Sequence, residues 1–359
     1  MSGSLEPQFD SLDRSGMGRL IEAAPAQVRA ALERIPAWTP PAAPPDLLAV
    51  GAMGGSAIAA DLAAALDRHR LPRPMLVVRD YRFPACVGRG SLALLASYSG
   101  NTEETLSLAE EARARSIPWR GLTTGGRLAE LCAAAGVESR ALPTGMPPRA
   151  AVYAAWVAVS RLLAGLGWID DPLAAWRETV AALESCVVAW GLARAEAAND
   201  AKRLARAMAG RQVFLHAEQR LEPVVTRWRN QLNENAKLLA HSTVVPELNH
   251  NEVVGWERAQ AFAAGAVAVV LRDGDESAPN EARLALTAEF LRRQGVTVLE
   301  PEPPGGGGLA RMASLVLLGD YVSFYLAMAN GVDPTPIASL DEFKRRLSEW
   351  RASRADRSA

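Results

Sequence analysis

LALLASYSGNTEETLSLAEEA, residues 92–112, carries the two signals on which the fold prediction rests. LALLA is a short apolar run typical of a buried strand, and EETLSLAEEA has the spacing of a helix. Between them stand hydroxyl and amide side chains, with Ser97, Ser99 and Thr102 around Gly100. Such residues continue a strand poorly, but they can donate hydrogen bonds to an anion. The stretch therefore predicts a strand, an anion-binding turn and a helix in succession.

The same alternation continues on both sides of this unit. Apolar runs of strand length occur at 47–50, 75–78, 92–96, 139–144, 212–217, 266–273 and 296–301. Helix-like segments follow several of them, at 57–68, 103–115 and 127–135. Alternating strands and helices favour parallel, doubly wound sheets. We therefore predict an α/β protein with two doubly wound, mainly parallel-sheet domains and flanking helices.

The length agrees with two cores, because 359 residues, 49% of them hydrophobic, suffice for two domains of about 150 residues each. The cluster PAWTPPAAPP at 36–45 interrupts an N-terminal helical pattern, and an Ala-rich helical tract separates the two series of strands. The predicted divisions are an N-terminal helix with a Pro-rich linker at 1–45, a first domain at 46–165, a helical bridge at 166–208, and a second domain with a C-terminal helix at 209–359.

Charge and cysteine content restrict the class of protein. Lys and Arg number 39 against 40 for Asp and Glu, so no global field draws the chain to nucleic acid or an anionic membrane. Three scattered cysteines form neither a disulfide framework nor a zinc motif, which favours a cytoplasmic protein. The N-terminus has no signal-like apolar segment, and we expect no membrane partner. An anionic ligand must therefore be bound locally.

A second loop has the composition of an anion site. GAMGGSAIAADL, residues 51–62, follows the first predicted strand, with Gly54 and Gly55 allowing tight turns and Ser56 opening a helix. In a doubly wound sheet both loops lie at the carboxyl ends of strands, where ligands bind. Taken alone, each loop is equally consistent with a routine capped turn. Because neither matches a Walker or dinucleotide-binding motif, the pair favours a phosphate monoester.

RWRNQLNENAKLLAHS, residues 227–242, reads as a helix with Asn230, Glu234 and Lys237 on one face. The ordinary interpretation is a surface Glu–Lys ion pair. The four amides of NQLNEN beside one carboxylate are unusual for a merely soluble face, and they favour a functional interpretation. The tract VVPELNHNEVVGWE follows at 244–257, and it carries His250 between two asparagines in a predicted loop after Pro246 and Glu247. His250 is a candidate for proton transfer near neutral pH.

These motifs resemble those of a known family. The glycine-rich first loop and the Ser-x-Ser-Gly-x-Thr second loop resemble the sugar isomerase (SIS) domain. TTGGRLAEL at 123–131, PPRAAV at 147–152, NENAK at 233–237, PELNHN at 246–251 and DEFKRRL at 341–347 follow in the order of the bifunctional phosphoglucose/phosphomannose isomerases. The resemblance implies an aldose–ketose isomerase that needs no metal or redox cofactor. It also implies a sugar phosphate held by Gly54, Gly55, Ser56, Ser97, Ser99 and Thr102.

The resemblance further implies the catalytic roles, which composition and spacing alone do not show. Glu234 would be the base, His250 and Lys344 would act in ring opening, and Arg149 would face the intermediate. Thr335 would leave space near C2 of the sugar, although Asp-Pro-Thr-Pro is also ordinary turn chemistry. Finally, the resemblance implies a homodimer in which His250 is donated across the subunit interface.

Two other functions remain open at the level of the sequence. A non-catalytic sugar-phosphate sensor uses the same kind of domain, but it should carry a DNA-binding domain, and no basic helix-turn-helix is evident. A transferase built on this domain would need an ammonia-generating partner domain, which is also not evident.

Overall fold

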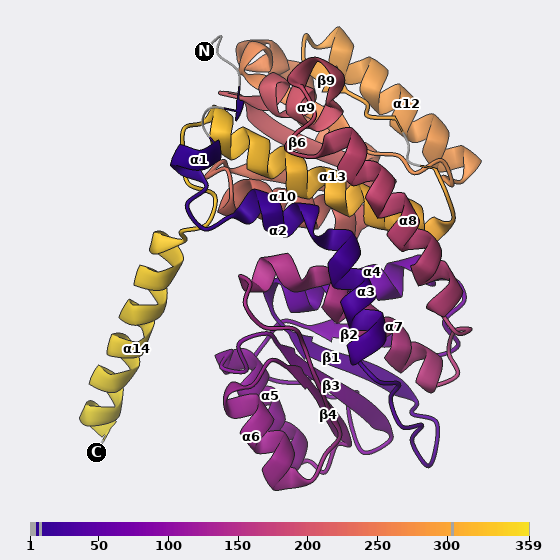
Figure 1. Cartoon of the computed structure of the whole chain (residues 1–359), viewed down its shortest axis with the longest axis vertical. Coiled ribbons are helices and arrows are strands. Elements are labelled where there is room, and N and C mark those ends of the chain that lie inside the picture. Colours follow the sequence, from indigo (N-terminus) through magenta and orange to yellow (C-terminus); the bar gives the residue numbers. More distant parts are fainter. Residues whose placement is uncertain (1–4, 7–8, 303–304, 359) are drawn as a thin grey trace.

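The computed structural model of the chain describes residues 5–6, 9–302 and 305–358, with 352 and 354–358 as backbone only. The chain forms two units, each a parallel sheet flanked by helices (Figure 1). The prediction of an α/β fold with two doubly wound, mainly parallel sheets is confirmed. The exact domain boundaries stay a prediction.

The first sheet has five parallel strands in the order β2-β1-β3-β4-β5. They are β1 (Leu47–Ala52), β2 (Met75–Val78), β3 (Ser91–Ser97), β4 (Trp119–Thr123) and β5 (Ser139–Ala141). The connecting helices are α4 (Gly54–Leu66), α5 (Glu103–Ala114) and α6 (Gly126–Ala135). Strand β3 is buried along its whole length, as expected of the apolar run at its centre. Its central place brings the loop that follows it to the middle of the carboxyl edge.

The second sheet has four parallel strands in the order β7-β6-β8-β9. They are β6 (Gln212–Glu218), β7 (Ala240–Val245), β8 (Ala266–Val270) and β9 (Thr297–Leu299), with helices α10 (Glu222–Glu234) and α12 (Ala278–Arg293) between them. The predicted helix at 227–242 is wrong in its second half. Helix α10 ends at Glu234 and Lys237 has a φ of 54°. Strand β7 begins at Ala240, and its β-branched residues Thr243, Val244 and Val245 pair with β6.

Short helical segments follow β6 and β7. They are the 3-10 turns η4 (Gln219–Leu221), η5 (Glu247–His250), η6 (Trp256–Ala261) and η7 (Ala263–Gly265), with the one-turn helix α11 (Glu252–Gly255). Of these, η4 comes after β6, and the others come after β7. The loop predicted after Pro246 and Glu247 is therefore a series of tight helical turns rather than irregular chain.

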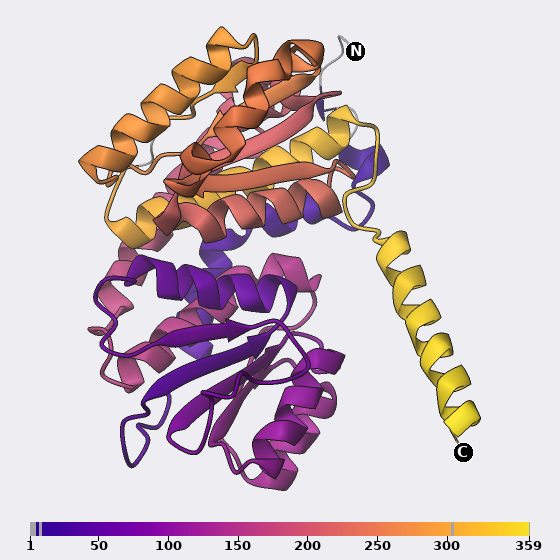
Figure 2. The same cartoon turned by 180° about the vertical axis from the view of Figure 1, so that it is seen from behind.

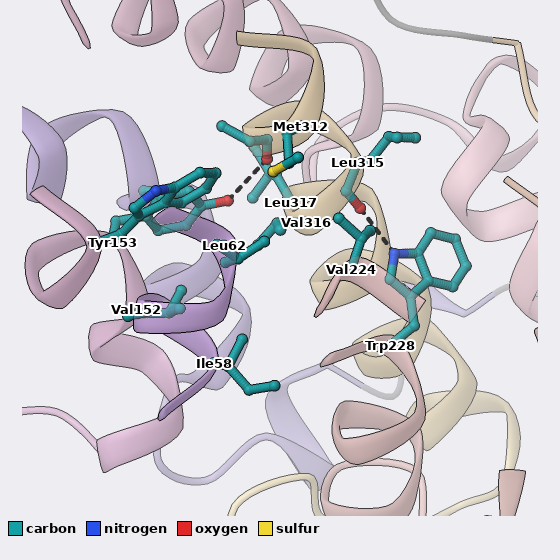
Figure 3. Packing of buried hydrophobic residues seen from close by; sticks show 14 of the residues in the cluster. Ile58, Leu62, Val152, Tyr153, Val224, Trp228, Met312, Leu315, Val316 and Leu317 are labelled. Atoms are coloured by element: carbon teal, nitrogen blue, oxygen red, sulfur yellow. Dashed lines mark hydrogen bonds between the residues drawn. The ribbon is translucent and has the colours of Figure 1, made fainter. Parts of the chain in front are cut away.

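Helices join the two units. They are α1 (Phe9–Leu12), α2 (Met17–Glu22), α3 (Ala24–Arg34), η2 (Pro148–Ala151), α7 (Val152–Gly165), α8 (Leu173–Trp190), η3 (Glu196–Ala198), α9 (Asp200–Met208) and α13 (Gly308–Ala329). Apolar side chains from α4, α7, α10 and α13 meet in one core (Figure 3). Within it, the indole of Trp228 donates to the carbonyl of Leu315 at 2.8 Å. By length and composition α13 could cross a membrane, but its apolar window is completely buried in this core.

Helix α14 (Ala338–Ser358) leaves the second unit and projects along one side of the first (Figures 1 and 2). Near its far end Arg351 forms an ion pair with Glu103, the first residue of α5, and donates to the hydroxyl of Tyr81 at 3.0 Å. The helix therefore spans the distance between the second unit and the anion loop of the first.

Candidate functional site

The loop from Ser97 to Thr102 leads from the carboxyl end of β3 to the start of α5. The Oγ of Ser97 lies 2.7 Å from the Oγ1 of Thr102, and it accepts the backbone N–H of Gly100 at 3.1 Å. Ser97 is buried, Thr102 half-buried and Ser99 exposed. Thr102 does not cap α5 with its side chain. The hydroxyls therefore stand at a helix N-terminus, where backbone N–H groups and the helix dipole favour an anion.

Gly100 brings this loop against the loop that follows β4. Its φ is 70°, and a Cβ at this position would lie 1.8 Å from the carbonyl oxygen of Gly125. The N–H of Leu128 donates to the carbonyl of Gly100 at 2.9 Å, and the N–H of Arg127 donates to Oδ1 of Asn101 at 3.0 Å. The SYSGNT and TTGGR motifs thus form one backbone-packed unit that has no room for a side chain at position 100.

The glycine-rich loop after β1 packs against the segment that carries Arg149. Helix α4 begins at Gly54, whose φ is 50°, and Ser56 is buried in its first turn. A Cβ on Gly55 would lie 3.2 Å from the carbonyl oxygen of Pro148, in the turn η2 that carries Arg149. The N-terminus of α4 therefore packs directly against the Arg149 segment.

Arg149 is the centre of the site. Its buried guanidinium donates from Nε to Oδ1 of Asn235 at 2.8 Å, and from Nη2 to the carbonyls of Pro334 at 2.9 Å and Thr335 at 2.8 Å. Its Nη1 lies 3.6 Å from Oε2 of Glu234. Burial lowers the pKa of Arg149 from its ordinary value, and the Glu234 carboxylate opposes that shift. One side chain thus joins three segments that are distant in the sequence.

Glu234 is the last residue of α10, and its side chain is 37% exposed. Lys237, the expected surface partner, instead donates from Nζ to the backbone carbonyl of Glu234 at 2.7 Å. Burial, followed by the charge of Arg149, lowers the pKa of Lys237. The described partner of the Glu234 carboxylate is therefore the buried arginine, and a solvated Glu–Lys bridge is not what the structure shows.

A buried polar network behind Arg149 escaped the sequence analysis. Arg227 donates from Nη2 to the carbonyl of Arg149 at 3.0 Å and to Oδ2 of Asp320 at 2.8 Å, and Gln231 donates to Oδ1 of Asp320 at 3.0 Å. Burial raises the pKa of Asp320, against the lowering effect of Arg227. A single carboxylate in the otherwise apolar run of α13 was the signal available in the sequence.

Thr335 reaches the site through the loop before α14. Its N–H donates to Oδ1 of Asp333 at 2.9 Å, and its carbonyl accepts from Arg149. The Thr335 hydroxyl is buried, and within the described part of the chain it has no hydrogen-bond partner. Arg149, Glu234 and Thr335 are therefore gathered at one place, beside Gly55.

His250 lies elsewhere in the same chain. The N–H of Ala240, the first residue of β7, donates to Oδ1 of Asn233 at 3.1 Å, so Glu234 lies at the amino end of that strand. His250 is exposed in η5, beyond the carboxyl end of β7. A strand of this length spans roughly 17 Å. Lys344 is exposed on α14. The structure therefore does not bring His250 to Glu234 within one subunit.

A cleft of about 950 Å³ opens between α4 and α10, which lie side by side (Figure 2). Gly54 and Asn230, one helical turn before Glu234, belong to its lining, but Arg149, Glu234 and the anion loop do not. Four guanidinium groups also line it, those of Arg68, Arg73, Arg79 and Arg229. The cleft thus lies next to the site, and its lining is rich in arginine.

Solved structures with this architecture define a class of protein. The chain is similar to a putative phosphosugar isomerase from Silicibacter pomeroyi, with a TM-score of 0.68 and 19% identity over 89% of this chain and 99% of that one. It is also similar to a glucose-6-phosphate isomerase like protein from Thermus thermophilus, with a TM-score of 0.60 and 20% identity over 93% and 98%. These similarities show the fold, two parallel-sheet α/β units in one chain, which this protein shares with structures named as phosphosugar isomerases or as similar to them.

Sequence relatives identify the family within that class. Residues 197–347 match the bacterial phospho-glucose isomerase C-terminal SIS domain. The chain is 34% identical to a bifunctional phosphoglucose/phosphomannose isomerase from Caldicellulosiruptor bescii, over 85% of this chain and 90% of the relative. Identity to the protein of the same name from Aquifex aeolicus is 33%, over 83% and 89%. The chain belongs to the bifunctional phosphoglucose/phosphomannose isomerase family.

Proposed function

We propose that this protein interconverts glucose 6-phosphate and mannose 6-phosphate with fructose 6-phosphate. The observation that carries the proposal is the approach of the half-exposed Glu234 carboxylate to the buried Arg149 guanidinium at 3.6 Å. A solvent-accessible base beside a fixed cation is what proton abstraction next to a carbonyl requires. The names of the relatives point to the same reaction.

The isomerisation moves one proton between C1 and C2 through a cis-enediolate. One carboxylate on one face of that intermediate can remove the proton and return it, and Glu234 is assigned this role. Negative charge develops on the enediolate oxygens, and Arg149 is assigned their stabilisation. Because Arg149 is held by Asn235 and by two carbonyls, it needs little rearrangement as the charge forms. Thr335 is assigned the space beside C2.

The phosphate is assigned to the two loops at the carboxyl edge of the first sheet. Ser97, Ser99 and Thr102 supply hydroxyls, and Gly54, Gly55 and Ser56 supply a second helix N-terminus. Because Gly55 touches the Arg149 segment, a sugar bound by its phosphate at these loops would extend toward Arg149 and Glu234. This order of contacts suits a chain with phosphate at C6 and chemistry at C1 and C2.

Ring opening is assigned to His250 and Lys344. The role assigned to His250 supports a homodimer. His250 lies at the far end of β7 from Glu234, so it would have to come from the partner subunit. Exposed apolar side chains on α14 support association, since Leu340 is 43% and Phe343 65% exposed.

The direct test is to incubate the purified protein with fructose 6-phosphate and to resolve the products. We expect both aldose phosphates, and their loss in Glu234→Gln. Formation of neither aldose by the wild-type protein would contradict the proposal.

A further inference from the structure

The turn that carries His250 is fastened on both sides of the histidine. Nδ2 of Asn249 donates to Oγ1 of Thr287 at 2.9 Å, and Nδ2 of Asn251 donates to Oε1 of Glu247 at 2.6 Å. His250 is exposed, and among the described residues its imidazole forms no hydrogen bond with another side chain. The two asparagines are thus used to hold the turn, while the imidazole between them stays available.

Helix α12 is the support behind this turn. Thr287 is only 3% exposed, and Nη1 of Arg283, one helical turn earlier, donates to Oδ1 of Asn249 at 3.3 Å. Leu248 is 1% exposed and packs in one apolar cluster with Leu284 of α12. One face of α12 therefore contacts both the nitrogen and the oxygen of the Asn249 amide, and it also contacts the side chain of Leu248.

We propose that Thr287 is a positioning residue for His250, acting through Asn249. The inference rests on the proposed function, because the role of His250 in ring opening belongs to it. Proton transfer requires the donor and acceptor atoms to lie about 2.6–3.2 Å apart. An error of about 1 Å in such a geometry can cost up to about a hundredfold in rate. A turn held by a buried hydroxyl keeps an exposed imidazole within that tolerance.

The test compares two substitutions of Thr287 in the full-length protein. Thr287→Val keeps the shape but removes the acceptor of the Asn249 amide, whereas Thr287→Ser keeps the hydroxyl. We expect Thr287→Val to lower kcat about tenfold and to change KM less than about twofold. Thr287→Ser should retain most of the wild-type kcat. The matched control is Thr179→Val, at a fully buried threonine of α8 that donates to the carbonyl of Ala175 at 2.7 Å, and it should leave kcat unchanged.

A double-mutant cycle separates positioning from general damage. If Thr287 acts through His250, Thr287→Val should lower kcat in the wild-type background but add nothing to His250→Ala. Equal losses in both backgrounds, or a wild-type kcat in Thr287→Val, would overturn the inference alone. Full activity of His250→Ala would overturn the inference together with the assigned role of His250. An inactive wild-type protein would overturn the proposed function and the inference with it.

Discussion

Nη1 of Arg149 lies 3.6 Å from Oε2 of Glu234, although 85 residues separate them in the chain. The guanidinium is buried and the carboxylate half-exposed, so the cation is fixed while the base can reach solvent or a ligand. Their pairing depends on η2 and the end of α10 meeting where the helices of the two units pack together. This pair is the basis for the predictions on catalysis.

Glu234→Gln should reduce kcat for every substrate by at least about a hundredfold, because the amide keeps the shape but cannot act as a base. Sugar-phosphate binding should be largely retained. Exchange of solvent deuterium into C2 of the substrate measures the step directly. Glu222→Gln, at the opposite end of the same helix, is the control and should exchange normally. Native exchange in Glu234→Gln would remove Glu234 from the role of base.

Ser99→Ala and Thr102→Ala should chiefly raise KM, since phosphate contacts bind substrate and transition state nearly alike. Loss of a hydrogen-bond donor to a charged oxygen costs about 1.5–3 kcal/mol of binding free energy, which corresponds to a rise in KM of about tenfold to a hundredfold. Thr102→Ala also removes the partner of the Ser97 hydroxyl at 2.7 Å, so its effect should depend on Ser97 in a double-mutant cycle. Ser185→Ala on α8 is the control. Unchanged binding of sugar phosphate in both loop variants would contradict the anion site.

Thr335→Gln should lower turnover of mannose 6-phosphate about tenfold more than that of glucose 6-phosphate. Forming both C2 epimers requires the enediolate to turn about its C2–C3 bond, and a longer side chain beside Arg149 would obstruct that rotation. Thr335→Ser keeps the hydroxyl and the space, and should preserve the ratio. The measurement is kcat/KM on each aldose phosphate. An equal loss on both substrates would show that Thr335 does not set epimer choice.

Mixing inactive Glu234→Gln and His250→Ala proteins should restore partial activity if the two residues meet across a subunit interface. In such a heterodimer one of the two shared sites carries both native residues and the other carries neither. Up to about half of the activity of the wild-type dimer should therefore return. Activity of heterodimers isolated with two different affinity tags is the measurement. No recovery in verified heterodimers would place both residues in one subunit.

Stability should fall as the pH falls from about 6.5 to about 4, in part because of His216. This histidine is completely buried, with Nδ1 3.1 Å from Oγ1 of Thr243, and burial lowers its pKa to about 4. Glu252 opposes that shift and His241 adds to it. As the pH falls, the unfolded chain therefore binds the proton before the folded chain does. This difference lowers the free energy of unfolding by at most about 1.4 kcal/mol per pH unit for one group.

Urea unfolding between pH 7.5 and 4 measures this dependence. His216→Gln should reduce the slope, whereas His69→Gln, at an exposed position in the turn after α4, should keep it. An unchanged slope in His216→Gln would assign the pH dependence to other groups.

The sequence by itself determined the parallel sheets, the turn from Ser97 to Thr102 and the family. Alternating apolar runs and helical segments specify a doubly wound sheet through local periodicity, and Gly100 and the hydroxyls around it act within one short turn. Each of these signals depends on residues close in the chain, so one sequence suffices to detect them. The same local logic failed at 235–242, where helix-compatible residues follow Glu234, because pairing of β7 with β6 outweighs local propensity.

Only the tertiary structure decided which polar groups meet. Nothing near Glu234 in the sequence indicates that its partner is Arg149 rather than Lys237, or that Asp320 from an apolar helix holds Arg227 behind that pair. The tertiary structure also places His250 at the opposite end of β7 from Glu234, although only 16 residues separate them. Such contacts depend on how the helices of the two units pack at their shared boundary. That packing is determined by the whole apolar core, and no single stretch of sequence encodes it.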